Sequence, residues 1–260
     1  MSNRSPQEWL SFLLSCADEA DEISTHYFRG GQLKPITKKN KSFVTDADLE
    51  VEKKIRETAS AFDNALQILG EEYGSCPKDA PLKLVVDPID GTANFMRGIP
   101  LYATLLAIEI EGEIVAGVVS SPAAHERWWA VKEGGSFYNG DQIQVSQISD
   151  LSQAQSFYGG LYGLETEGMP DGLLPLLEKT YRQRGFGDYY AHALVAMGCG
   201  EFAVDYGLNP WDVAPLLILN KEAGGTVTDL TGPAGLYSKV FISTNGVIED
   251  QVKSHLTLVS

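Results

Sequence analysis

Three β-rich segments follow one another between residues 102 and 132, and this succession constrains the fold more than any other feature of the sequence. The segments Tyr102 to Ile110, Ile114 to Ser120 and Arg127 to Lys132 are separated by the turn signals Glu111-Gly112 and Ser121-Pro122. Because short turns return a chain antiparallel to itself, we predict three consecutive antiparallel strands here.

Helical periodicity dominates the residues before this region. Apolar side chains recur at spacings of three and four from Pro6 to about Phe28, which predicts an amphipathic helix ended by Gly30-Gly31. A second helix is expected to open at Asp46 or Asp48. Its apolar stripe consists of Val51, Ile55, Ala59 and Phe62.

Short strands are expected at 68–69 and 83–86, and the second should stop at Asp87-Pro88, because proline cannot donate to a strand ladder. Further predicted elements are a helix at 189–198, a strand at 202–205, a helix at 211–223, strands at 226–229 and 240–243, and a last helix. This alternation is typical of layered α/β proteins with mixed sheets. We expect residues 1–150 to form an N-terminal α+β half with metal-binding loops, and residues 151–260 to form an α/β half that completes the active site.

Composition excludes several classes of protein. With 260 residues and 43% hydrophobic side chains, the chain can build a sizeable core. A net charge of −15 repels phosphate backbones, so we expect no nucleic-acid partner. The apolar stretch Leu101 to Ile110 is too short to span a membrane, and the N-terminus lacks the apolar centre of a secretory signal, so we expect no membrane association and a cytoplasmic location. Cys16, Cys76 and Cys199 are widely spaced and are expected to be free thiols.

The densest chemical signal is the segment Asp87-Pro-Ile-Asp-Gly-Thr-Ala-Asn-Phe95. A strand that ends at Asp87 delivers one carboxylate to the sheet edge, and Asp90 adds a second before Gly91-Thr92 can start a helix. Hard cations such as Mg²⁺ prefer oxygen ligands, and amides at a helix start bind phosphate oxygens. One loop could therefore hold a metal and an anion together, although an isolated segment of this kind is more often an ordinary turn and helix cap.

Two other acidic segments have plain interpretations when taken alone. The glutamates of Gly70-Glu71-Glu72 are typical of a solvated loop, and the Asp of Trp211-Asp212 is favoured in the first turn of a helix by the helix dipole. The occurrence of all three segments in one chain, in this order, favours a shared metal site instead.

These segments resemble the signatures of the inositol monophosphatase family of metal-dependent phosphatases. Lys38 to Asp48, Gly70-Glu71-Glu72, Asp87 to Phe95 and Trp211 to Gly225 match in order and spacing, so the resemblance covers nearly the whole chain. It implies a layered α/β/α/β/α sandwich of the inositol monophosphatase and fructose bisphosphatase type. It also implies Mg²⁺ dependence, lithium sensitivity, a homodimer and a small-molecule phosphate ester as substrate. One departure is the crowding of Lys38, Lys39 and Lys41 in a loop where the family generally shows one or two basic residues.

The resemblance also implies roles for individual residues. Glu71, Asp87 and the carbonyl of Ile89 would hold a first metal ion, and Asp87, Asp90 and Asp212 a second, with a third, weaker ion beside Glu71. Two ions about 4 Å apart can activate a water and clamp both the attacking and the leaving oxygen of an in-line displacement.

The nucleophile would then be a water, and no Ser, Cys or His nucleophile is needed. Thr92, hydrogen-bonded to Asp48, would orient this water beside Glu71, while Asp90, Gly91, Thr92 and Asp212 would also contact the substrate. The four histidines are scattered, and we interpret them as structural or surface residues. They are His26, His125, His192 and His255.

A finer resemblance is to the histidinol-phosphate phosphatase branch of the family. It rests on 87–107, on 126–130 with its tandem Trp128-Trp129, and on 184–190 with the step Gly187-Asp188. Histidinol phosphate carries a primary ammonium, with which Asp188 and Asp205 could pair. Arg184 is a further candidate substrate contact. The tryptophans also have a plain interpretation, in which one ring lies in the core and the other in an interface.

Three hypotheses about function remain open. The first is a Mg²⁺-dependent histidinol-phosphatase, and its nearest rival is an inositol monophosphatase acting on inositol 1-phosphate or with broad specificity. The third, of another class, is a non-catalytic regulatory binding protein with the same fold. A scaffold has no reason to keep unpaired acids together against their repulsion, so the acidic segments favour an enzyme.

Overall fold

The computed structural model describes residues 4–28, 36–37, 43–74, 76–161 and 168–257. Lys38, Lys39 and Lys41, the basic residues of the sequence analysis, lie outside these ranges, as does the predicted helix end at Gly30-Gly31. Within the described part, no helix combines the length and apolar character that crossing a bilayer requires.

Seven strands form the larger sheet, in the order β3-β4-β5-β6-β7-β8-β9. Only the β3 and β4 pair is parallel, and the remaining neighbours are antiparallel. The antiparallel strands predicted at 102–132 are therefore confirmed. The strands are β3 (Gln67–Gly70), β4 (Leu82–Asp90), β5 (Ala103–Ile110), β6 (Glu113–Ser121), β7 (Glu126–Val131), β8 (Gly135–Tyr138) and β9 (Asp141–Ile143).

The second sheet mixes parallel and antiparallel pairs in the order β11-β10-β12-β14-β13. Its strands are β10 (Gln155–Tyr158), β11 (Arg182–Arg184), β12 (Phe202–Tyr206), β13 (Thr226–Thr228) and β14 (Val240–Thr244). A short antiparallel pair, β1 (Ile36–Thr37) and β2 (Phe43–Val44), precedes the second helix. The sequence analysis did not predict β8 to β11, because these strands are short and mix polar with apolar residues.

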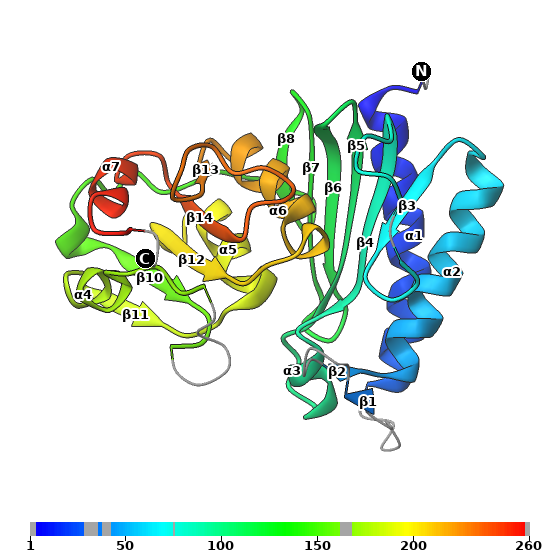
Figure 1. The fold of residues 1–260 in the computed structure, drawn as a ribbon, viewed down its shortest axis with the longest axis horizontal. Helices are drawn as coiled ribbons and strands as arrows, with labels where there is room; N and C mark the ends of the chain where they lie inside the picture. Colours follow the sequence, from blue (N-terminus) through cyan, green and yellow to red (C-terminus); the bar gives the residue numbers. More distant parts are fainter. Residues whose placement is uncertain (1–3, 29–35, 38–42, 75, 162–167, 258–260) are drawn as a thin grey trace.

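Helices cover both sheets and separate them from each other (Figure 1). The helices are α1 (Pro6–Tyr27), α2 (Asp46–Phe62), α3 (Thr92–Met96), α4 (Leu173–Glu178), α5 (Asp188–Ala196), α6 (Pro210–Glu222) and α7 (Glu249–Lys253), with a 3₁₀ turn η1 (Leu151–Gln153). Figure 1 shows α1 and α2 outside the larger sheet, α5 and α6 between the sheets, and α4 and α7 outside the smaller one.

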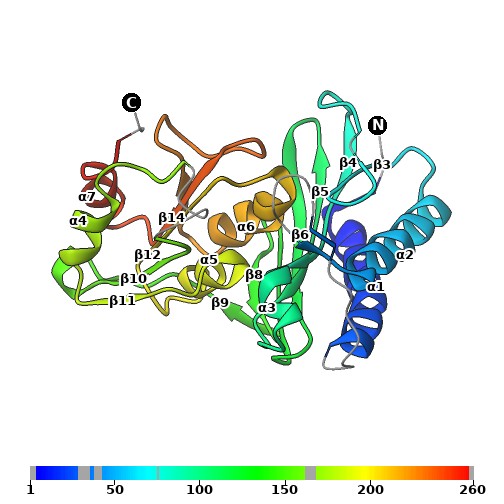
Figure 2. The ribbon, with the colours of Figure 1, turned by 60° about the horizontal axis from the view of Figure 1, so that its bottom comes forward.

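Three clusters of buried side chains correspond to these layers. One joins α1 and α2 to the larger sheet, the second packs α5 and α6 against the opposite face of that sheet, and the third joins α4 and α7 to the smaller sheet. This arrangement is the expected α/β/α/β/α sandwich, and the turned view in Figure 2 keeps α6 and α5 between the sheets. The division into halves at residue 150 stays a prediction.

The strand expected to stop at Asp87-Pro88 instead continues to Asp90, so this prediction was wrong. The pairing of β4 with β5 shifts in register between Asp87, which lies opposite Leu105, and Asp90, which lies opposite Ala103. Two residues of β4 thus face only Thr104 of β5, and this β-bulge accommodates the proline without a ladder bond. The Pro88 carbonyl accepts a hydrogen bond of 2.8 Å from the Thr104 hydroxyl.

Helix α6 lies so close to β6 that a glycine is needed between them. A Cβ at Gly117 would lie 2.9 Å from both Pro215 Cα and Ile218 Cγ2. We therefore expect Gly117→Ala to lower the free energy of unfolding by about 1–3 kcal/mol through overpacking. Urea denaturation measures the change, and Gly232→Ala, where nothing lies within 4 Å, is the control. Equal stability of the two variants would contradict this close packing.

Candidate active site

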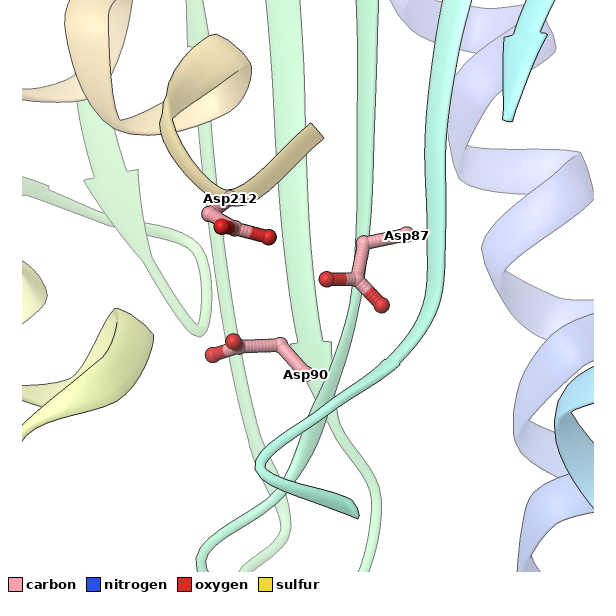
Figure 3. Close-up of side chains that lie close together, drawn as sticks. All are labelled: Asp87, Asp90 and Asp212. Carbon is pink, nitrogen blue, oxygen red and sulfur yellow. The ribbon is translucent and has the colours of Figure 1, made fainter. Parts of the chain in front are cut away.

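The bulge in β4 places two carboxylates on the same side of the strand. Side chains alternate along a regular strand, so residues three apart, such as Asp87 and Asp90, would point to opposite faces. The extra residue in the bulge reverses this alternation, and both carboxylates face the start of α6 (Figure 3). Carboxylate oxygens of Asp87, Asp90 and Asp212 all lie within 4.8 Å of one another. The strand irregularity is therefore what assembles this acidic cluster.

Asp212 is held in place by the cap of α6. Asn209 is the N-cap and Pro210 follows it, and Asp212 Oδ2 accepts a hydrogen bond of 2.7 Å from the Asn209 amide. This reciprocal capping box fixes the carboxylate at the helix start. Asp212, which taken alone could be only a first-turn residue favoured by the helix dipole, is thus both part of the cap and a member of the cluster.

Asp87 and Asp90 are each fixed by one backbone amide. The Ile89 amide donates to Asp87 Oδ1 at 3.1 Å, and the Tyr189 amide, from the first turn of α5, donates to Asp90 Oδ2 at 2.8 Å. The carboxylate orientations therefore depend on β4, α5 and α6 together.

Burial and mutual repulsion make these carboxylates hard to ionise. Desolvation raises the pKa of Asp87 well above its ordinary value, and the charges of Glu71 and Asp90 raise it further. Desolvation, together with the charges of Asp188 and Asp212, likewise raises the pKa of Asp90. The pKa of Asp212 is raised to about 7, chiefly by burial. A divalent cation would supply the missing countercharge, and its preferred ligands are oxygens of this kind, so the residues fit a metal centre.

Glu71 lies beside this cluster, in the loop after β3. Its charge raises the pKa of Asp87, although its oxygens are not among those that lie within 4.8 Å of one another. Its amide donates to the Val86 carbonyl at 3.3 Å, which ties the loop to β4.

A residue that the sequence analysis missed holds the next part of this loop. Glu52 of α2 is fully buried, and its carboxylate accepts hydrogen bonds from the amides of Glu72 at 2.7 Å and Tyr73 at 3.2 Å. Arg56 donates to the same carboxylate at 2.8 Å. A Cβ at Gly70 would lie 2.1 Å from Glu52 Oε1, so the glycine makes room for this contact. A glutamate next to Val51 in the apolar stripe of α2 is the signal that could have found it.

Thr92, at the start of α3, lies close to Asp48 of α2. The Thr92 hydroxyl donates to the Ile89 carbonyl at 2.9 Å and lies 3.5 Å from Asp48 Oδ1. Asp48 Oδ2 accepts from the Thr45 amide at 2.8 Å, as the N3 member of the α2 capping box. Burial raises the pKa of Asp48 to about 6. The Ile89 carbonyl, a predicted metal ligand, and the Thr92 hydroxyl, predicted to orient a water, are therefore hydrogen-bonded to each other.

Two of the predicted substrate contacts, Asp188 and Asp205, lie near Asp90. A Cβ at Gly91 would lie 3.5 Å from Asp188 Oδ2, so Asp188 is beside the turn that follows Asp90. Asp205 is close enough to raise the pKa of Asp90. Arg184 instead donates to the Gln183 carbonyl at 2.8 Å.

The tandem tryptophans point to opposite faces of β7, as expected of neighbouring strand residues. Trp128 is fully buried in the core between the larger sheet and α5, and its Nε1 donates to Met197 Sδ. Trp129 is partly buried on the other face and stacks on Phe137. Trp128 is thus a core residue, and it packs against Tyr189, whose amide holds Asp90.

Comparison with known proteins decides the family. The sequence matches the model of the inositol monophosphatase family over residues 5–259. The chain belongs to the inositol monophosphatase family. It is 36% identical over 252 residues to the histidinol-phosphatase of Mycobacterium tuberculosis, which covers 95% of this chain and 97% of that protein.

Two further similarities extend this result. The chain is 37% identical over 227 residues to the fructose-1,6-bisphosphatase/inositol-1-monophosphatase of Thermotoga maritima, with 85% of this chain and 86% of that protein covered. A solved inositol monophosphatase structure from Thermotoga maritima has a TM-score of 0.83 at 32% identity, covering 95% of this chain and 96% of that one. The protein therefore has the inositol monophosphatase fold and is a phosphatase, which removes the hypothesis of a non-catalytic binding protein.

The raised carboxylate pKa values predict a pH-dependent response to metal. The folded protein keeps protons that the unfolded chain releases near pH 4, so the metal-free protein loses stability as the pH rises toward about 7, the pKa of Asp212. Mg²⁺ would bind the deprotonated form, and we expect it to raise Tm more at about pH 8 than at about pH 5.5. Differential scanning fluorimetry with Mg²⁺ or with EDTA measures this. The same rise at both pH values would contradict the prediction.

Glu52 does not belong to the acidic cluster, but we predict that its substitution lowers activity through the loop that carries Glu71. Glu52→Gln replaces one acceptor oxygen by an NH₂ group that cannot accept from the Glu72 or Tyr73 amide, so the loop that carries Glu71 should shift. We expect kcat/KM to fall by about 10- to 100-fold, the range found for groups that support metal ligands. The control is Glu57→Gln, an exposed glutamate of the same helix. Activity within about twofold of the wild type would rule out this supporting role.

Proposed function

We propose that this protein is a Mg²⁺-dependent histidinol-phosphatase, which hydrolyses L-histidinol phosphate to L-histidinol and phosphate. The observation that carries the proposal is the presence of two acidic side chains, Asp188 and Asp205, beside Asp90 but outside the cluster of three aspartates. The similarity to histidinol-phosphatases supports it, including a second one from Streptomyces coelicolor that is 37% identical over 249 residues.

Two or three Mg²⁺ ions per subunit would be held by the acidic cluster and its neighbours. The proposed ligands are Glu71, Asp87, the Ile89 carbonyl, Asp90 and Asp212. Bound in this way, the ions would lower the pKa of a water and neutralise charge on the phosphate oxygens. The donor set supports this assignment, because carboxylate and carbonyl oxygens are the ligands that Mg²⁺ prefers.

The chain's own groups would orient the reactants. The Thr92 hydroxyl, between the Ile89 carbonyl and Asp48, can turn to accept from a water while it donates to Asp48. That water would lie beside Glu71 and attack the phosphorus atom as the bond from phosphorus to the ester oxygen breaks. The ester oxygen leaves with a proton as an alcohol. The backbone at Gly91 and Thr92 would contact the phosphate oxygens.

The ammonium of histidinol phosphate would bind between Asp188 and Asp205. A charge-assisted hydrogen bond from an ammonium to a carboxylate is about twice as strong as one between neutral groups. An inositol ring offers only hydroxyls at the same place, so the two carboxylates favour the cationic ester. Arg184 stays a candidate contact to the rest of the substrate.

A broader inositol monophosphatase is the second candidate function. The relative from Thermotoga maritima, whose name includes both fructose-1,6-bisphosphatase and inositol-1-monophosphatase, favours it. The two candidates share the acidic cluster and the same attack by water, and they differ only in the groups that surround the alcohol part of the ester.

Other family properties form part of the proposal. These are inhibition by lithium, assembly as a homodimer and a cytoplasmic location. The acidic net charge of −15 supports the expectation that neither nucleic acid nor a membrane surface is a partner.

The proposal predicts a ranking of substrates. Phosphate release from histidinol phosphate, inositol 1-phosphate and phosphoadenosine phosphate is compared by kcat/KM with Mg²⁺ and with EDTA. We expect histidinol phosphate to be preferred by about tenfold or more, which corresponds to about 1.4 kcal/mol of transition-state binding. Asp188→Asn should reduce this preference, whereas Asp141→Asn, an exposed change on β9, should not. A preference for inositol 1-phosphate would support the second candidate, and release without metal would refute both.

A further inference from the structure

A histidine lies behind the carboxylate of Asp205, buried between α5 and the smaller sheet. The His192 side chain is 2% exposed, and its Nε2 lies 3.2 Å from Asp205 Oδ2. Nδ1 of the same ring lies 2.7 Å from the hydroxyl of Ser243, a fully buried residue of β14. The ring also packs edge-on against Phe241, with centroids 4.8 Å apart. Ser243, His192 and Asp205 thus form a chain of polar contacts that ends at the proposed substrate pocket.

The two facing atoms depend on each other. His192 Nε2 and Asp205 Oδ2 are both buried, and neither has a conventional hydrogen-bond partner within the described part of the chain. A buried polar atom without a partner costs free energy, so the 3.2 Å contact between these two atoms is the interaction that offsets this cost. An unprotonated Nε2 would repel the carboxylate, so the contact favours the tautomer with its hydrogen on Nε2. In that tautomer Nδ1 accepts a hydrogen bond from the Ser243 hydroxyl.

The other carboxylate oxygen of Asp205 lies on the side of Gly159. A Cβ at Gly159 would lie 2.3 Å from Asp205 Oδ1, so this oxygen lies against the backbone of Gly159. Gly159 in turn packs on Gly187, since a Cβ at Gly187 would lie 3.1 Å from the Gly159 Cα. Gly187 is the residue before Asp188, and Asp188 is beside the turn after Asp90. The carboxylate therefore has one oxygen toward His192 and the other toward the start of α5.

We propose that His192 is a positioning residue for substrate selection, which uses its contact with Asp205 Oδ2 to keep Oδ1 available for the ammonium group of a cationic phosphate ester. The inference rests on the proposed function, because it names the residue that sets the selectivity of the same site. While Oδ2 is held against the His192 ring, Oδ1 would be the oxygen that accepts a hydrogen bond from the substrate. When the Ser243 hydroxyl donates to His192 Nδ1, it favours the tautomer whose hydrogen is on Nε2, the atom that faces Asp205.

The test separates positioning from a merely structural role by comparing two substrates. His192→Leu removes the contact, and we expect it to raise KM for histidinol phosphate by about tenfold or more, the effect typical of a supporting group, and to leave kcat for inositol 1-phosphate within about twofold. His192→Gln can place an amide NH near the former Nε2 and should restore KM to within about threefold of the wild type. His26→Gln, on the exposed face of α1, is the control.

A double-mutant comparison sharpens the result. If His192 acts through Asp205, His192→Leu should add little to the loss caused by Asp205→Asn alone, whereas independent roles would add. If His192→Leu does not fold, Ser243→Ala serves in its place, because loss of the hydroxyl frees the ring to adopt the wrong tautomer. It should then raise KM for histidinol phosphate and leave KM for inositol 1-phosphate unchanged.

The outcomes distinguish this inference from the proposed function. A wild-type enzyme that does not prefer histidinol phosphate overturns the proposed substrate, and the inference with it. If the wild type prefers histidinol phosphate, but His192→Leu and Ser243→Ala weaken activity equally on both substrates, the inference alone is overturned. A His192→Leu variant whose KM for histidinol phosphate stays within about threefold of the wild type also overturns it.

Discussion

Repulsion among the carboxylates of Asp87, Asp90 and Asp212 is the constraint on which the rest of the site depends. Desolvation raises the pKa of Asp87 and Asp90, and the neighbouring like charges raise it further, so the cluster is held together against its own charge. Backbone amides of Ile89, Tyr189 and Asn209 hold one carboxylate each. The fold thus provides an acidic site, and a divalent cation would offset the repulsion among its carboxylates.

The layers of the sandwich explain how these amides come together. Strand β4 lies in the larger sheet, and α5 and α6 pack between the two sheets (Figure 1). Tyr189 in the first turn of α5 and Asp212 in the first turn of α6 both reach the carboxylates at the end of β4. Gly117 permits the close approach of α6 to that sheet, and Glu52 ties α2 to the loop that carries Glu71. Packing in the core therefore positions the acidic side chains, and we expect substitutions at Gly117 or Glu52 to change the geometry of the cluster through these contacts.

The residues proposed to select the substrate lie on the other side of Asp90, in the smaller sheet and in α5. Asp205 belongs to β12, and its neighbours His192 and Ser243 belong to α5 and β14. The larger sheet supplies most of the acidic cluster, while the smaller sheet and α5 surround the place proposed for the alcohol part of the ester. This separation permits relatives to share one reaction and differ in substrate, because changes on the second side leave the cluster intact.

The sequence by itself determined the family, the antiparallel strands at 102–132, the helices α1, α2, α5 and α6, and the candidates Glu71, Asp87, Asp90 and Asp212. These follow from local patterns, since periodicity, turn residues and short motifs need no distant partner to be recognised. The tertiary structure decided the rest: the bulge that carries β4 past Pro88, the support of the Glu71 loop by Glu52, and the contact of His192 with Asp205. Each depends on residues that are distant in sequence, or on the pairing of β4 with β5, and the pattern of a single segment does not encode which buried polar atoms will face each other.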